Sequence, residues 1–211
     1  MSSDSFESQM LDVMNKSALA LMLSVGHRTK LFDVLSKIPP STSHDVARQS
    51  NLNERYVREW LGAMVTSKII DYDPQTNLFS LSKKKADFLT NSGFYNFASS
   101  MQWIPALAQV EDSIVNCFKN GGGVTYESYN RFHAVMAEES SQTVLAGLVN
   151  KILPIVPGLI EKLQKGIAVL DVGCGSGRAI NLMAKTFSNS SFWAVIFLLR
   201  QFKTQKMKPK N

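Results

Sequence analysis

The sequence predicts an α/β protein with a mainly helical N-terminal part. Two observations carry this prediction. Residues before about 165 have the pattern of helices separated by breaks, with a single hairpin among them, whereas from Ile167 onward short apolar runs alternate with one helix. A chain of 211 residues is long enough for one large domain or two small ones. We expect a first domain over 1–90, a helical linker over 91–165 and an α/β segment over 166–211.

The first predicted helices lie upstream of Pro39 and Pro40. Apolar residues recur at helical spacing from about Phe6 to Ser24. Residues 26–38 continue in the same style, and the two prolines stop them because proline cannot continue a helix. The apolar stripe of the first helix suits a protein interface and equally suits a buried core helix.

The following segment has the element order of a winged helix. Thr42 and Asp45 have the spacing of a capping box, in which side chains satisfy the free N–H groups of a short helix. A second helix carries apolar residues at positions i, i+3, i+4 and i+7, which are Val57, Trp60, Leu61 and Met64. Alternating apolar residues on both sides of the sequence DPQTN then predict a hairpin. Helix, turn, helix and hairpin in this order predict a winged helix within residues 1–90.

Residues 91–165 are predicted to form a helical linker that is rich in aromatic side chains. Three consecutive glycines at 121–123 break the helical pattern, because glycine is unfavourable inside a helix. A helix is expected over 140–153, since five apolar residues share one face and Pro154 ends the pattern. These five residues are Val144, Leu145, Leu148, Val149 and Ile152.

The segment from Ile167 changes character. The run IAVLDV (167–172) is short and apolar with an acid near its end, as expected of a buried parallel strand. The glycines of GCGSG (173–177) turn the chain, RAINLMAKTF has a helical pattern, and SFWAVIFLL (191–199) has the pattern of a second strand. Strand, helix and strand make one β-α-β unit, about half of a Rossmann-like, doubly wound sheet.

The glycine loop is the most specific motif of the chain. Three alternate glycines follow an acid in the pattern D-x-G-x-G-x-G, whereas a dinucleotide fingerprint would place its third glycine at Arg178. The pattern resembles the first motif of class I S-adenosylmethionine-dependent methyltransferases. By that resemblance, the glycines let the backbone approach the methionine part of S-adenosylmethionine, the helix N-terminus favours its carboxylate, and the acid attracts its ammonium group. The implied cofactor-binding residues are Asp171, Gly173, Cys174, Gly175 and Gly177.

The resemblance covers roughly residues 15–192 and is closest to methyltransferases that carry an N-terminal winged helix. It implies methyl transfer to a small molecule, a winged helix that serves as a dimerisation and substrate-lid domain, and a linker that forms part of the substrate chamber. Tyr126, Arg131 and His133 would lie near the cofactor cleft. The residue that would catalyse the transfer stays unknown.

The chain departs from the family pattern after the motif. In such proteins the second strand ends in an acid that accepts the ribose hydroxyls, but positions 194–198 are apolar here and no acid follows Asp171. The later strands of the family domain are absent. We therefore expect a truncated chain that binds S-adenosylmethionine weakly and has little or no activity. A chain of this kind could also act as a non-catalytic partner of a full-length homologue, so both a homodimer and such a heterodimer are open.

The charge distribution argues against a nucleic-acid reader. The net charge is +6, yet all 17 acids lie at or before Asp171 beside 16 Lys and Arg, and the last 40 residues hold 7 basic residues and no acid. The high pI therefore belongs to the tail, which we expect to be solvated and disordered. A DNA-binding regulator is the alternative that a winged helix offers, but its candidate recognition helix balances Arg55 and Arg58 with Glu54 and Glu59.

Other classes find little support. His27, His44, His133 and the two cysteines lack the spacing of metal ligands, so no metal is expected. The chain has no apolar stretch long enough to span a membrane, and its polar, acidic N-terminus is unlike a targeting peptide. Cys117 and Cys174 are interpreted as free thiols, which places the protein in the cytoplasm.

Overall fold

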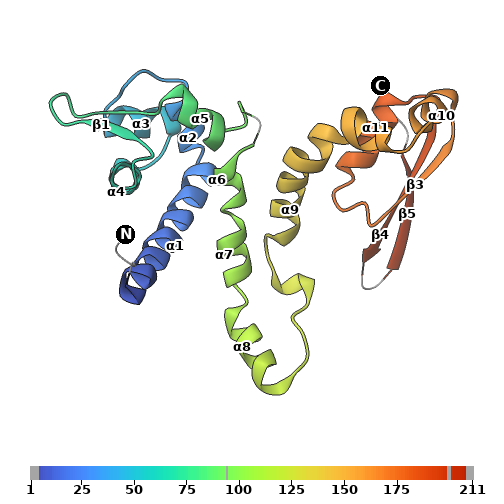
Figure 1. Cartoon of the computed structure of the whole chain (residues 1–211), viewed down its shortest axis with the longest axis horizontal. Helices are drawn as coiled ribbons and strands as arrows, with labels where there is room; N and C mark the ends of the chain where they lie inside the picture. The colour runs from blue at the N-terminus through green and yellow to red at the C-terminus, as the bar shows by residue number, and fades with distance from the viewer. Residues whose placement is uncertain (1–4, 94, 199–200, 208–211) are drawn as a thin grey trace. The chain divides into compact units, whose positions relative to one another are not determined.

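A computed structural model describes residues 5–93, 95–198 and 201–207 of the chain. They divide into two compact units, Met1–Val135 and Met136–Asn211, which are coloured blue to yellow-green and yellow to red in Figure 1. The prediction of an α/β protein with a mainly helical N-terminal part is confirmed. Within the described ranges, no helix is both long and apolar enough to cross a membrane.

The N-terminal unit contains the predicted winged helix. Its helices are α1 (Phe6–Arg28), α2 (Leu31–Leu35), α3 (Ser43–Ser50), α4 (Glu54–Thr66) and α5 (Lys83–Leu89). The wing is an antiparallel hairpin of β1 (Asp71–Asp73) and β2 (Leu78–Ser80), with Tyr72 opposite Phe79. The predicted first helix ends four residues later than expected, at Arg28, and the left-handed Lys30 (φ 63°) separates it from α2.

The capping box between Thr42 and Asp45 is confirmed. The hydroxyl of Thr42 accepts a hydrogen bond from the backbone N–H of Asp45 at 3.2 Å and donates one to the Asp45 carboxylate at 2.7 Å. The Thr42 hydroxyl, followed by the charge of Arg48, lowers the pKa of Asp45. The N-terminus of α3 is thus capped with the help of a carboxylate whose ionised form is stabilised.

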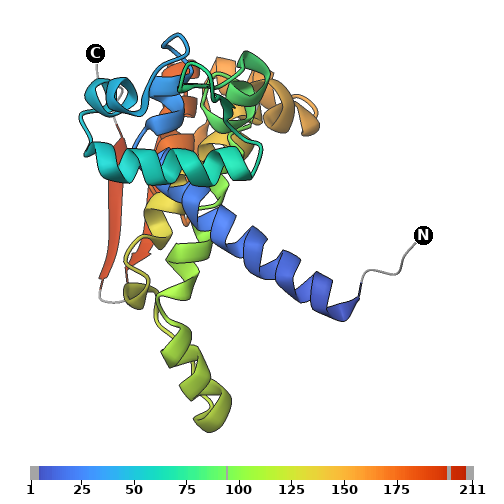
Figure 2. The ribbon, with the colours of Figure 1, turned by 90° about the vertical axis from the view of Figure 1, so that its left-hand side faces the viewer.

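The core of the winged helix lies where α1, α2 and α4 meet. Phe32 and Trp60 pack edge to face with ring centroids 5.1 Å apart, and both side chains are buried with Leu61 and Met64. The first half of α1 has no such cover. Figure 2 shows this half of α1 extending away from α4, which agrees with the exposure of Phe6 and Met14.

The remainder of the N-terminal unit is helical, as predicted. It comprises α6 (Phe97–Ser100), α7 (Trp103–Ala108), α8 (Glu111–Asn120), a 3-10 turn η1 (Tyr126–Ser128) and the first residues of α9 (Phe132–Ser140). The glycines at 121–123 stand between α8 and η1, outside any helix. A buried polar contact joins α1 to this part, because Nδ2 of Asn96 lies 3.4 Å from Nδ1 of His27.

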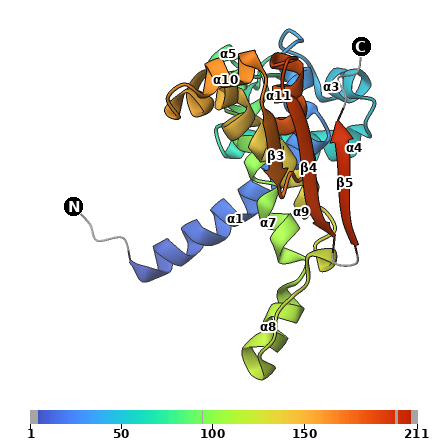
Figure 3. The same ribbon diagram turned by 90° about the vertical axis from the view of Figure 1, so that its right-hand side faces the viewer.

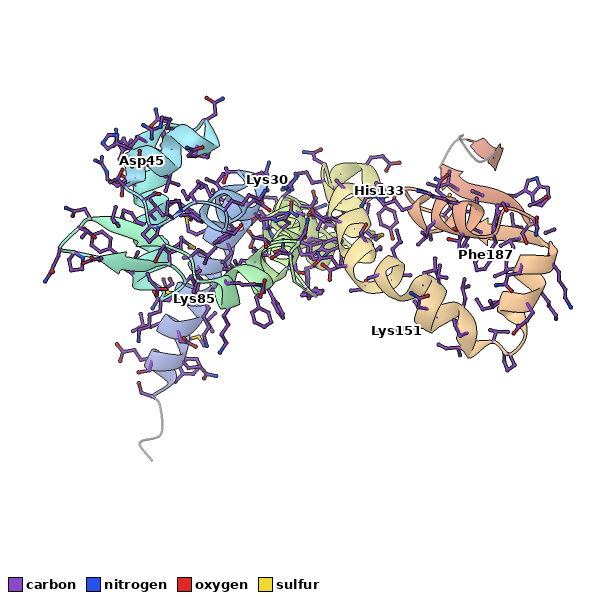
Figure 4. All side chains as sticks on the ribbon, turned by 90° about the horizontal axis from the view of Figure 1, so that it is seen from above. Lys30, Asp45, Lys85, His133, Lys151 and Phe187 are labelled. Carbon is purple, nitrogen blue, oxygen red and sulfur yellow. The ribbon has the colours of Figure 1, made fainter. Side chains whose placement is uncertain are left out.

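The C-terminal unit contains the predicted β-α-β arrangement. Its sheet has the order β3 (Ala168–Val172), β4 (Ser191–Leu198) and β5 (Gln201–Met207). Strands β3 and β4 are parallel and are connected by α11 (Arg178–Thr186), while β5 runs antiparallel to β4. The core lies between the sheet, α11 and α10 (Leu159–Lys165), with Leu163, Ile180 and Phe187 buried in it; Figure 4 labels Phe187.

One face of this sheet is bare. Leu170 and Val172 on β3 are 59% and 76% exposed, and the register places them beside Trp193 and Val195 of β4. This face is turned to the viewer in Figure 3, with α11 behind the sheet. Parallel strands are normally covered on both faces. We predicted a buried strand here, but one face of β3 exposes its apolar side chains.

For this unit, one expectation was confirmed only as a helix of another type, and a second was wrong. The predicted helix over 140–153 consists of two π-helical stretches, η2 (Ser141–Leu145) and η3 (Leu148–Ile152), followed by a 3-10 turn η4 (Leu153–Ile155). The lysine-rich tail was expected to be disordered, yet Gln201–Met207 forms β5, while residues 208–211 lie outside the described residues. Strand β5 pairs with β4 and forms the outer edge of the sheet, and lysine is common on strands in such a position.

Candidate cofactor site

The glycine loop joins the end of β3 to the start of α11. Gly173, Gly175 and Gly177 have φ values of 81°, 53° and 72°, in the left-handed region where residues with a Cβ are strained. A Cβ added at Gly173 or Gly175 would meet no heavy atom within 4 Å. These glycines are therefore required by the backbone path, and the space beside two of them is open to a ligand.

Hydrogen bonds hold this loop in place at both ends. The N–H of Gly173 donates to the oxygen of Val195 in β4 at 2.7 Å, and the N–H of Gly177 donates to the oxygen of Cys174 at 2.8 Å. The side-chain amide of Asn181 donates a further bond to the backbone oxygen of Gly177 at 2.8 Å. The first backbone N–H groups of α11 have no partner within the helix. They form a site that favours an anion.

Asp171 and Cys174 flank the loop. Asp171 is half-buried on β3, opposite Ala194 of β4 in the register. Cys174 is a half-buried free thiol whose sulfur lies 3.9 Å from the oxygen of Gly175. All five residues expected to bind the cofactor thus lie in one continuous segment at the carboxyl end of β3, which is where open α/β sheets bind ligands.

Arg178 is a residue that the sequence argument did not assign to the site. It is the first residue of α11 and directly follows the last glycine. Its Nη1 donates hydrogen bonds to the oxygen of Ala137 at 3.0 Å and to the hydroxyl of Ser141 at 2.6 Å. The only signal in the sequence was its position, where a dinucleotide fingerprint would have a third glycine.

The residues expected near the acceptor lie in the N-terminal unit around Phe132. Four rings surround it, with centroid distances of 5.2 Å to Trp103, 5.4 Å to Tyr126, and 5.8 Å to both Tyr129 and His133. Tyr126 and His133 lie 6.0 Å apart by ring centroid, and both are exposed; Figure 4 labels His133 on α9. Arg131 donates a hydrogen bond to the side-chain oxygen of Gln102. The structure therefore brings two of the three expected residues together.

The wing and its neighbours carry paired charges. Lys85 contacts Asp71 of β1 at 2.7 Å, Lys83 contacts Asp87 at 3.0 Å, and on α4 Arg58 lies 3.8 Å from Glu54. These carboxylates reduce the positive potential with which a DNA-binding protein attracts phosphates. The geometry gives the DNA-binding alternative no support.

Comparisons with known proteins agree with this architecture. Residues 17–91 match the family described as an Rv2258c-like winged HTH domain. No curated protein matches the chain. Among solved structures, human N-acetylserotonin methyltransferase in complex with S-adenosylmethionine is similar with a TM-score of 0.62 and 14% identity, over 92% of this chain and 59% of that one.

Two further solved structures show a similar likeness. The mitomycin 7-O-methyltransferase MmcR gives a TM-score of 0.58 at 14% identity, over 89% of this chain and 57% of that one. An O-methyltransferase family protein from Burkholderia thailandensis gives 0.58 at 12% identity, over 92% and 56%. The chain spans less than two thirds of the length of each of these structures. By its fold, the chain is a winged-helix domain followed by a Rossmann-like β-α-β unit, and both resemble the corresponding parts of these methyltransferase structures.

Proposed function

We propose that the chain binds S-adenosylmethionine at the glycine loop and is related in function to methyltransferases that act on small molecules. The loop geometry supports this most directly. Three left-handed glycines lie at the carboxyl end of a parallel strand, with open space beside two of them and a helix N-terminus behind. A solved structure with the same fold is a complex with S-adenosylmethionine.

Each residue of the loop has a role in this proposal. Asp171 attracts the ammonium group, the open sides of Gly173 and Gly175 let the backbone approach the methionine chain, and the N-terminus of α11 holds the carboxylate. Cys174 lines the same loop. Bound S-adenosylmethionine supplies a methyl group that its sulfonium already activates, so the protein has mainly to position an acceptor in line with it.

The acceptor side of the proposal rests on the aromatic cluster around Phe132. Tyr126 and His133 present adjacent exposed rings with hydrogen-bonding groups at their edges. We propose that they contact a small-molecule acceptor, and that Arg131 supports them from the side through its bond with Gln102.

Binding is expected to be weak, because β4 brings no acid to the ribose. Two hydrogen bonds to a charged acceptor are worth roughly 1.5–3 kcal/mol each. Losing both lowers the affinity on the order of 10² to 10⁴ fold, which turns a micromolar ligand into one near millimolar. The residues at the end of β4, including Ile196, are apolar.

Ligand-observed NMR and titration calorimetry on the full chain test the proposal. We expect the wild-type chain to bind S-adenosylmethionine near the millimolar range, Asp171→Asn to bind more weakly and Ile196→Asp to bind about tenfold or more tightly. Glu161→Gln, which removes an exposed acid from α10, is the matched control and should leave the affinity unchanged. Absence of binding by a folded wild-type chain would contradict the proposal, and micromolar binding would show that the ribose is held elsewhere.

We also propose that the chain pairs with a second copy through the first half of α1. Its apolar side chains here are exposed, namely Phe6, Met10, Leu11, Val13 and Met14. Most of the stability of a helix in a protein comes from packing its apolar face, and a second copy would cover this one. A longer homologue with the same helix would use the same surface.

A further inference from the structure

Arg178 connects the glycine loop to the junction between α9 and η2. Its Nη1 reaches both the oxygen of Ala137 in α9 and the hydroxyl of Ser141, the first residue of η2. Ser141 in turn donates its hydroxyl to the same Ala137 oxygen at 2.7 Å. Three groups, one each from α11, α9 and η2, thus form a closed triangle of hydrogen bonds, which we call the Arg178 clamp.

The clamp lies where the helix changes its hydrogen-bonding pattern. Helix α9 ends at Ser140 and continues directly into the π-helical η2. Backbone bonds shift there from i→i+4 to i→i+5, and π segments of this kind are rare and frequently occur at functional sites. Two side-chain donors converge on the oxygen of Ala137 at this change. Arg178 therefore stabilises a helical junction that is intrinsically unfavourable.

The guanidinium of Arg178 has further N–H donors besides those of Nη1. Arg178 carries five N–H groups in a rigid plane, and only those of Nη1 bond to residues that the structure describes. The side chain is exposed and starts from the first position of α11, next to Gly177. A planar guanidinium can hold a carboxylate with one edge while another nitrogen keeps its own bonds.

We propose that Arg178 is a positioning residue that couples occupancy of the glycine loop to the order of the α9–η2 junction. This inference rests on the proposed function, because the ligand is the amino-acid carboxylate of S-adenosylmethionine at the N-terminus of α11. The carboxylate binds Nε and Nη2, fixes the guanidinium plane, and so fixes Nη1 on Ala137 and Ser141. Helix α9 begins with Phe132 and His133, one turn before Ala137, so ordering the junction also steadies the helix that carries the proposed acceptor residues.

Hydrogen exchange of the full chain measures this coupling. S-adenosylmethionine at saturating concentration should slow amide exchange in residues 137–146 of the wild-type chain by about tenfold, equivalent to about 1.4 kcal/mol. 5′-Methylthioadenosine, which lacks the amino-acid carboxylate, should not slow it. Arg178→Ala should abolish the slowing and Arg178→Lys should restore only part of it, since lysine cannot form the planar fork. Lys185→Ala, at the other end of α11, is the matched control and should behave as wild type.

Ser141→Ala separates coupling from cofactor binding. It removes one acceptor of the clamp, so it should weaken the slowing while the affinity for S-adenosylmethionine stays within about twofold of wild type. Slowing that persists in Arg178→Ala, or that 5′-methylthioadenosine produces equally, would overturn the coupling while leaving the proposed function intact. If the wild-type chain binds neither ligand, the proposed function itself is wrong and the coupling with it.

Discussion

The indole nitrogen of Trp60 donates a 2.9 Å hydrogen bond to the backbone oxygen of Met22, which ties α4 to α1 across the core of the winged helix. One turn further along α1, Gly26 brings the two helices into close approach. A Cβ built at Gly26 would lie 2.4 Å from Cζ2 of Trp60 and 2.6 Å from Cε2 of Phe32. The bond and the missing side chain together set how closely α1 lies on α4.

The first prediction concerns this close approach. Gly26→Ala should lower the free energy of unfolding by about 1–3 kcal/mol, because the methyl group overpacks against two buried rings. Gly62→Ala is the control on α4, where a Cβ meets nothing within 4 Å; it should instead stabilise by roughly 0.5–1 kcal/mol through better helix propensity. Urea unfolding followed by tryptophan fluorescence compares the two variants. Equal effects of the two substitutions on the free energy of unfolding would show that α1 and α4 can move apart to accommodate the added methyl group without loss of stability.

The second prediction concerns pH and the cap of α3. The hydroxyl of Thr42 lowers the pKa of Asp45 in the folded state, so this carboxylate contributes stability above its unfolded pKa and loses it as the pH falls through its folded pKa. Thr42→Ala should raise the pKa of Asp45 towards its ordinary value, and Thr42→Ser should keep it low. Carboxyl NMR titration is the measurement. Thr76→Ala should act on Asp73, whose pKa the Thr76 hydroxyl lowers, and leave Asp45 alone.

The third prediction concerns the pairing of two copies. Met14 is 67% exposed on the uncovered half of α1, and a charge there would be buried in the proposed interface. Met14→Glu should therefore turn a dimer into a monomer in sedimentation experiments. Asn15→Glu adds the same charge at the next position, which is already polar and exposed, and should leave the dimer in place. A wild-type chain that is monomeric at high micromolar concentration speaks against this interface.

The fourth prediction concerns the left-handed glycines. Gly175→Ala places a Cβ at a φ of 53° and into the open side of the loop, so it should reduce S-adenosylmethionine affinity by about tenfold or more. Gly122→Ala carries a comparable backbone strain, at a φ of 95° with nothing within 4 Å, but lies between α8 and η1. It should leave the affinity unchanged, which calorimetry in the Ile196→Asp background can measure. Similar losses in both variants would mean that strain alone, and not the site, is being detected.

The fifth prediction concerns the bare face of the sheet. Leu170→Thr combined with Val172→Thr should reduce aggregation on light scattering, because the strand keeps β-favouring residues while its exposed face loses apolar surface. Val169→Thr is the control on the same strand. It packs towards the covered face, so it should lower stability without improving solubility.

The sequence was informative where local pattern decides structure. The wing was predictable because apolar residues alternate on both sides of a turn. The glycine loop was predictable because alternate glycines directly after a strand are typical of a tight turn into a helix. The π-helical stretches were not predictable, since their apolar spacing matches an α-helix and contacts between distant residues, such as that of Arg178 with Ala137, are not visible in a local pattern. Strand β5 was missed because pairing with the edge of β4 outweighs a lysine-rich composition. The hydrogen bonds of Arg178 could not be predicted either, because their partners lie 37 and 41 residues away in the sequence.

The bond from Gly173 to Val195 has a consequence for the order in which the chain acquires structure during synthesis. A ribosome adds about 5–20 residues per second, and domains fold largely as they emerge. The winged helix draws its core from residues up to Ala98, so its partners are all present before any of β3 has been made. The glycine loop can reach its final conformation only after β4 has left the ribosome, because the N–H of Gly173 bonds to the backbone oxygen of Val195. Nascent chains halted before β4 should hold a finished winged helix and an unformed loop.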